Sequence, residues 1–119
     1  VAYLSDHGPA GELGPGPDGV GPYHEAAMTL CAGVDLLIHD AQYTADELPT
    51  YLHFGHSAVE YSVELARRAG AATVLLFHHD PDRTDAAVAA IEQRFQVTPG
   101  VTVVAAREGA TFGLGHPKP

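Results

Sequence analysis

The sequence predicts an α/β protein whose strands form a mainly parallel sheet. Short apolar runs alternate along the chain with segments of helical period, and two of these runs are apolar at nearly every position. Continuous apolar runs are typical of strands buried on both faces, and strand–helix alternation favours parallel strands joined by right-handed crossovers. We therefore expect about four strands alternating with three helices, in one domain over residues 1–119.

The first half of the chain begins with a predicted strand over residues 1–5, VAYLS. A loop rich in Gly and Pro follows over 8–22, and loops of this length are usually functional or mobile. A helix is predicted from Tyr23, with Gly33 placed to end it. The run VDLLI, 34–38, is the second predicted strand, and it should end just before a His-Asp pair.

The clearest predicted helix starts at Ser57 and ends near Gly70. Ser57 is followed three residues later by Glu60, the spacing of a capping box, in which each side chain bonds the other residue's backbone amide. Helical spacing puts three apolar residues on one face: Val59, Val63 and Ala66. This helix should therefore lie on the sheet with that face inward.

The remaining elements complete the alternation. TVLLF, 73–77, reads as a buried strand, and Thr84 is placed to cap a third helix. That helix carries one apolar stripe, made of Val88, Ile91 and Phe95. A fourth strand is predicted over 101–106, after a Pro-Gly turn, and the tail 113–119 is expected to be frayed.

Charge and cysteine content exclude several function classes. The net charge is −9, with six Lys and Arg in total. Binding to nucleic acid or to an anionic membrane needs clustered basic residues, so both are disfavoured. Cys31 is the single cysteine, which rules out an intrachain disulfide and fits a reducing compartment. No targeting or membrane-spanning run is visible, so a cytoplasmic location is expected.

Candidate site residues follow the predicted strands. Asp6 follows the first strand, Asp40 the second and His78 the third, while His56 precedes the helix that leads back. Because the carboxyl ends of parallel strands meet at one edge, we expect these side chains to converge. Imidazole and carboxylate groups suit zinc, and also manganese or iron. Five further histidines are expected to be structural, to support the ligands without binding metal, or to be solvated: His7, His24, His39, His53 and His116.

Four segments, in this order, resemble the C-terminal half of the metallo-β-lactamase-fold hydrolases. They are VAYLSD, DLLIHDAQY, GHSAVEYSVELARRAG and LLFHHDP. The ribonuclease Z and phosphodiesterase branch is the most similar. The resemblance implies the C-terminal half of an αββα sandwich and a site with two divalent ions, zinc first. It also implies that Asp6 and His78 are metal ligands, and that His56 is a general acid held by Asp40.

The sequence departs from that family in two ways. The His-x-His-x-Asp-His loop of the family is absent, as is the further His that precedes the bridging Asp. The missing ligands would come from an upstream half or a partner chain. As an isolated piece, the chain is expected to bind metal weakly or partially, and to be weak or inactive as an enzyme. Asp40 also stands where the branch has Glu, one methylene longer.

The resemblance and the candidate residues together predict a metal-dependent hydrolase acting on a small phosphodiester. A lactone or β-lactam hydrolase of the same fold is the first alternative. The second is a non-catalytic α/β binding or signalling module, with Asp6 and Asp40 as an acidic pocket. Assembly into a homodimer is a further alternative that the sequence allows.

Overall fold

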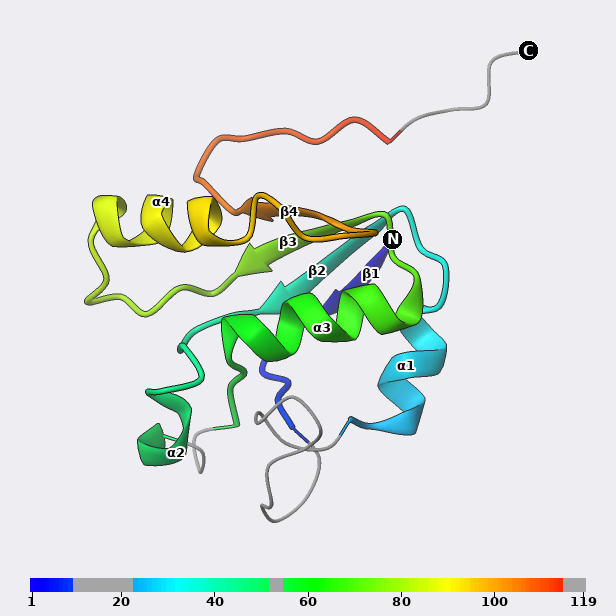
Figure 1. The fold of residues 1–119 in the computed structure, drawn as a ribbon, viewed down its shortest axis with the longest axis horizontal. Coiled ribbons are helices and arrows are strands. Elements are labelled where there is room, and N and C mark those ends of the chain that lie inside the picture. The colour runs from blue at the N-terminus through cyan, green and yellow to red at the C-terminus, as the bar shows by residue number, and fades with distance from the viewer. Residues whose placement is uncertain (10–22, 52–54, 115–119) are drawn as a thin grey trace.

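The computed structural model describes residues 1–9, 23–51 and 55–114. Figure 1 shows its elements. In chain order they are β1 (Ala2–Leu4), α1 (Glu25–Cys31), β2 (Leu36–Asp40), α2 (Leu48–Tyr51), α3 (Val59–Ala69), β3 (Thr73–Phe77), α4 (Asp85–Arg94) and β4 (Thr102–Ala105). The predicted strand–helix alternation is confirmed, with the short helix α2 as an addition. Most of the predicted loop 8–22 and of the tail 113–119 lies outside the described residues.

The four strands form one parallel sheet in the order β1-β2-β3-β4. Each strand pairs with its sequence neighbour, so every crossover advances by one position in the same direction. All carboxyl ends therefore lie at one edge of the sheet, where β1, β2 and β3 point in Figure 1. Within the part of the chain that the structure describes, every helix is too short or too polar to cross a membrane.

One face of the sheet is fully covered. The register aligns Ala2, Leu37, Val74 and Val103 in one row across the strands. Their exposures are 3%, 0%, 0% and 4%, and they belong to the same core cluster as Cys31 of α1, several residues of α3 and Ile91 of α4. The three longer helices thus bury this face, and its row of apolar side chains is the centre of the fold.

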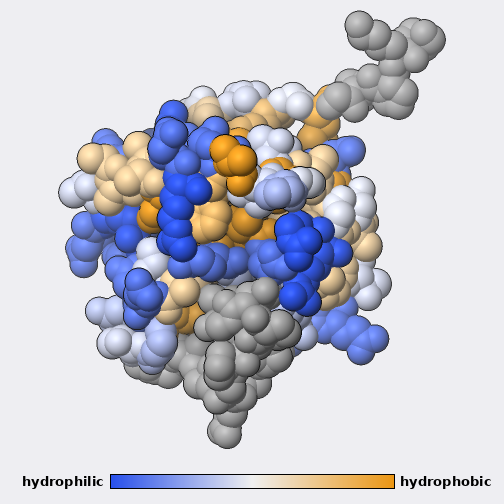
Figure 2. Space-filling model, viewed as in Figure 1, coloured by the Kyte–Doolittle hydropathy of each residue, from blue (hydrophilic) through white to orange (hydrophobic). Residues whose placement is uncertain are grey.

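The opposite face is only partly covered. Its corresponding row is Tyr3, Ile38, Leu75 and Val104, of which Tyr3 is 54% exposed. The segment after β4 turns back, and its Phe112 and Leu114 line a hollow together with Leu36 and Thr73. Figure 2, viewed as in Figure 1 with α3 in front of the strands, shows hydrophobic side chains in the middle of the view, framed by hydrophilic ones.

The ends of the helices confirm two sequence-based predictions and correct one. Thr84 caps α4, since its hydroxyl accepts the amide of Ala87, and Gly70 ends α3 in the left-handed conformation with φ 73°. The prediction of a capping box at Ser57 and Glu60 is wrong, because α3 begins after Ala58 and has no side-chain cap. Glu60 instead accepts the amide of Ala45, at 3.0 and 3.1 Å.

The short helix α2 carries the capping interaction that was expected elsewhere. Thr44 precedes Glu47 by three residues, and its amide donates to Glu47 Oε1 at 2.8 Å. The amides of Glu47 and Leu48 donate to the Thr44 carbonyl, which starts the turn. The same Thr-x-x-Glu pattern is readable in the sequence. Arg83 also bonds Glu47 Oε1, at 2.8 Å, and fastens this segment to the chain after β3.

Candidate metal centre

The second strand is longer than predicted, and the extra residues carry the site. Instead of ending at residue 38, β2 continues through His39 and Asp40, which pair with Leu76 and Phe77 of β3. Both side chains are fully buried. Strand alternation separates them: His39 shares a row with Leu4, Leu76 and Ala105, and Asp40 points to the other side.

The buried carboxylate of Asp40 is held by backbone amides. Its Oδ1 accepts the amide of Ser57 at 3.0 Å and that of Gln42 at 3.2 Å. Its Oδ2 accepts Nδ1–H of His56 at 2.7 Å. A buried carboxylate without partners would be costly, and these bonds satisfy its oxygens and fix its direction.

His56 reaches Asp40 because two loops run side by side. The amide of Tyr43 donates to the Ser57 carbonyl at 3.1 Å, and the amide of Val59 donates to the Tyr43 carbonyl at 2.8 Å. This short parallel bridge brings the start of α3 next to the end of β2. Gly55 precedes His56 with φ 79°, a conformation that favours glycine.

Asp6 and His78 complete the group at the ends of β1 and β3. Asp6 Oδ1 lies 3.5 Å from His56 Nδ1, and His78 Nδ1 lies 3.5 Å from Asp40 Oδ2. Among the described residues, these two are the non-glycine positions with positive φ, at 50° and 61°. Such backbone costs about 1–3 kcal/mol and is found preferentially at functional sites.

The donor atoms of these residues suit a divalent cation. We refer to Asp6, Asp40, His56 and His78 as the carboxylate cluster. Each offers one ligand atom, and these atoms all lie within 4.8 Å of one another. Two imidazoles and two carboxylates are hard and borderline ligands that zinc, manganese and iron accept. The four side chains meet as expected; which of them bind metal and which transfer protons stays a prediction.

A second set of imidazoles lies on the helix-covered side of the same strand end. We call His7, His24 and His39 the histidine chain. His39 Nδ1 donates to the Asp40 carbonyl at 2.8 Å, which leaves Nε2 to accept from His7 Nδ1 at 2.8 Å. His7 Nε2 then accepts from His24 Nδ1 at 3.0 Å. The carbonyl at the inner end therefore fixes the tautomer of every ring.

The histidine chain runs from the buried His39 to the exposed His24, and burial favours the neutral form of its two inner rings, His39 and His7. Burial lowers the pKa of His39 to about 4, although the Asp40 carbonyl acts in the opposite direction. Burial and the neighbouring His24 also lower the pKa of His7. Ser62 of α3 donates to the same Asp40 carbonyl at 2.5 Å. Asp40 thus joins both networks, with its side chain in one and its carbonyl in the other.

Sequence reasoning missed the histidine chain as a unit. His7, His24 and His39 were expected to be structural, to support the ligands or to be solvated, and the connection among them was not foreseen. The available indication was strand alternation: His39 lies two residues after Leu37 and so faces the helices. His53 and His116 lie outside the described residues.

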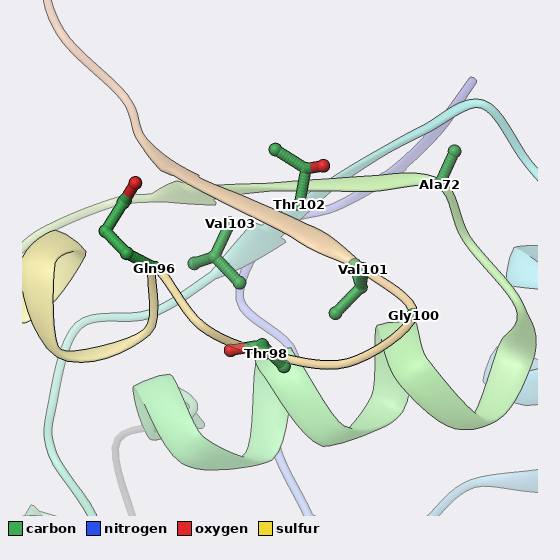
Figure 3. A pocket seen from close by; sticks show the side chains of 7 residues that line it. All are labelled: Ala72, Gln96, Thr98, Gly100, Val101, Thr102 and Val103. Carbon is green, nitrogen blue, oxygen red and sulfur yellow. The ribbon is translucent and has the colours of Figure 1, made fainter.

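The hollow shown in Figure 3 is a separate feature. It has a volume of about 350 Å³ and lies at the amino ends of β3 and β4, away from the carboxylate cluster. Its polar lining consists of Gln96, Thr98 and Thr102, with no titratable side chain. This lining offers no group for acid–base or metal chemistry.

Comparisons with known proteins give partial matches. Ribonuclease Z of Anoxybacillus flavithermus is 38% identical over 56 residues, which cover 47% of this chain and 18% of that protein. Ribonuclease Z of Thermoplasma volcanium is 37% identical over 51 residues, covering 43% and 17%. The match therefore spans less than a fifth of the length of these curated relatives. No protein-family model matches the chain.

A solved structure gives a broader match. It is the metallo-β-lactamase fold protein YhfI from Bacillus subtilis, with a TM-score of 0.59 and 23% sequence identity. The superposition covers 74% of this chain and 34% of that protein. At this identity the similarity concerns the fold.

Proposed function

Because this chain carries part of the metallo-β-lactamase fold, we propose that it belongs to a metal-dependent hydrolase that cleaves phosphodiesters. The main support is the 2.7 Å bond between His56 Nδ1 and Asp40 Oδ2, next to Asp6 and His78. An imidazole oriented by a buried carboxylate is the arrangement of a general acid or base. His56 lies beside Asp6 and His78, two further residues that could bind a metal ion, so its proton would be available next to a metal-bound substrate.

Asp6 and His78 are the residues that would hold the cation. Both are exposed at the strand edge, with side-chain exposures of 71% and 41%, whereas the side chain of Asp40 is at 0%. A bound divalent cation would lower the pKa of a water molecule and stabilise negative charge on phosphoryl oxygens. Zinc usually takes about four ligands. A two-ion site therefore needs ligands beyond those described, from an upstream segment of the same protein or from a partner chain.

His56 would supply the proton to the departing oxygen. Its Nδ1–H is engaged by Asp40, so the proton that is exchanged sits on Nε2. Two amides and the imidazole all donate to the Asp40 carboxylate, which fixes its direction. Its role is to orient the ring and to stabilise the protonated imidazole before transfer.

The substrate that we propose is a small phosphodiester. The relatives named ribonuclease Z support phosphodiester chemistry. The net charge of −9 argues against this part of the protein holding a long polyanion. A weak dependence of KM on salt concentration would support the small substrate, whereas a steep dependence would indicate a nucleic acid.

The test uses the full-length protein and bis(p-nitrophenyl) phosphate. We expect cleavage that stops after chelation and returns with zinc or manganese. His56→Ala should lower kcat by about 10²–10⁴-fold, the usual contribution of general acid–base catalysis. Cleavage of a chromogenic β-lactam or a lactone, with no activity on the phosphodiester, would overturn the proposal. The chain alone should bind metal weakly or partially, measured by metal analysis after dialysis.

A further inference from the structure

Gly8 lies directly on the backbone of His56. A Cβ built on Gly8 would be 2.4 Å from the His56 carbonyl oxygen and 3.0 Å from its carbonyl carbon. Real Cβ atoms essentially never show the first separation, the second is tighter than most real Cβ contacts, and both atoms belong to the main chain. The positive-φ glycines of the described residues do not include Gly8. The requirement for glycine is therefore one of space alone.

The backbone on the far side of this contact has little freedom to move. The amide of Ser57 is bonded to Asp40 Oδ1 at 3.0 Å, and the Ser57 carbonyl accepts the amide of Tyr43 at 3.1 Å. Ser57 is also fully buried. An added methyl group would therefore displace the segment that carries Gly8 rather than the one that carries His56.

The segment that would move contains Asp6. On one side of Gly8, the His7 ring is bonded to His39 at 2.8 Å, and Asp6 Oδ1 lies 3.5 Å from His56 Nδ1. Asp6 is also held with φ 50°. Two contacts thus hold this segment in place: the His7 side chain bonds His39 of β2, and the backbone of Gly8 packs against that of His56.

We infer that Gly8 is a positioning residue of the carboxylate cluster: its missing side chain sets the distance between Asp6 and His56. This inference rests on the proposed function, because it assigns Gly8 a part in holding a metal ligand next to the general acid. It assigns Gly8 no contact with substrate or metal. Displacing Asp6 by even about 1 Å would spoil a coordination geometry that tolerates little error.

The chain offers a matched control. Gly113 has no heavy atom within 4 Å of a built Cβ, and its φ is not positive. Gly113→Ala therefore adds the same methyl group to open space. Both variants change chain flexibility in the same way, so a difference between them reports the contact with His56.

The experiment measures the affinity of the metal-free full-length protein for Zn²⁺ by competition with a chromogenic chelator. Gly8→Ala should bind Zn²⁺ about 10–100-fold more weakly than wild type, as changes to the support of metal ligands typically do. Gly113→Ala should match wild type. Circular dichroism at the assay temperature checks that each variant is folded. If Gly8 had a purely structural role, Gly8→Ala would have a lower melting temperature but the same affinity for Zn²⁺ as wild type.

Two results are kept apart by this design. Equal Zn²⁺ affinity in Gly8→Ala and wild type overturns the role of Gly8 and leaves the proposed function standing. If wild type and Gly113→Ala bind no Zn²⁺, the proposed function fails, and the role of Gly8 fails with it.

Should Gly8→Ala not fold, the wild-type protein decides. A nuclear Overhauser effect between the Gly8 α-protons and the Ser57 amide, retained in the Zn²⁺-loaded protein, supports this packing, since a Cβ on Gly8 would lie 3.6 Å from Ser57 N. Loss of that effect on loading overturns it.

Discussion

The carboxylate cluster and the histidine chain start from adjacent residues of β2, yet their imidazoles differ in exposure and in the group that accepts their N–H. In the carboxylate cluster, the side chain of His56 is 15% exposed and its Nδ1 faces the Asp40 carboxylate at 2.7 Å. In the histidine chain, His39 is fully buried and ends on the Asp40 carbonyl at 2.8 Å. The first imidazole therefore faces a carboxylate, whereas burial lowers the pKa of the second.

This difference shows that two factors decide whether an imidazole can exchange a proton: its burial, and whether its N–H is accepted by a carboxylate or by a carbonyl. A carboxylate stabilises the imidazolium form, so a ring beside it can gain and lose a proton. A carbonyl satisfies one N–H without balancing a positive charge, and burial then lowers the pKa, as it does for His39. Changes in the carboxylate cluster should therefore affect turnover, and changes in the histidine chain should affect stability.

Asp40→Asn should give the largest effect. The amide matches the carboxylate in size, but it no longer stabilises a protonated His56. We expect kcat of the full-length protein on bis(p-nitrophenyl) phosphate to fall by roughly 10²–10⁴-fold, by analogy with other carboxylate–imidazole pairs. A fall of less than threefold would contradict the assignment of Asp40.

His39→Ala tests the structural side of the comparison. The substitution removes a fully buried ring and leaves the Nδ1 of His7 without its acceptor. We expect a loss of about 3 kcal/mol in the free energy of unfolding, from the cavity and the unpaired group. Urea titration followed by circular dichroism measures it. A loss below about 1 kcal/mol would show that the core does not depend on the histidine chain.

Acid should weaken the fold through the same residue. The pKa of His39 is about 4 in the folded protein, against 6.5 as its ordinary value. The unfolded state therefore binds the proton first, and stability is lost as the pH falls below about 6.5. Between pH 8 and pH 5 the expected loss is about 2 kcal/mol. Unfolding measured at both pH values should show a smaller loss in His39→Gln, and an equal loss would assign it to other groups.

His24→Ala should give the smallest effect. His24 is the exposed outer member of the histidine chain, and it makes no side-chain bond to the amides of α1. We expect a change of about 0.5 kcal/mol or less in unfolding free energy and an unchanged kcat. A large drop in kcat would show that the two networks exchange protons, against the separation described above.

The fold was predictable because its elements follow local rules. The apolar run at 73–77 and the cap at Thr84 are confirmed, as is the inward face of α3 formed by Val59, Val63 and Ala66. The resemblance to the metallo-β-lactamase-fold superfamily is also confirmed, over part of the chain. These features depend on residue type and spacing, which the sequence states directly.

The parts that were missed depend on tertiary competition for polar groups. Glu60 has the spacing of a capping residue, but Ala45 and Arg94 take its carboxylate. The polar pair His39-Asp40 resembles the end of a strand, but both residues pair with β3 and are therefore part of β2. The convergence of Asp6, Asp40, His56 and His78 followed from parallel topology, whereas the space that requires Gly8 depends on a close backbone approach that no local pattern encodes.

The carbonyl of residue 40 would be present whatever side chain stood there. The histidine chain ends on that carbonyl, so its anchor does not depend on the carboxylate. Under the proposed function, a descendant that had lost catalysis could replace Asp40 and His56 and still retain His7 and His39 for its architecture. Among related sequences, loss of the first pair with retention of the second would then mark a scaffold without the proposed activity.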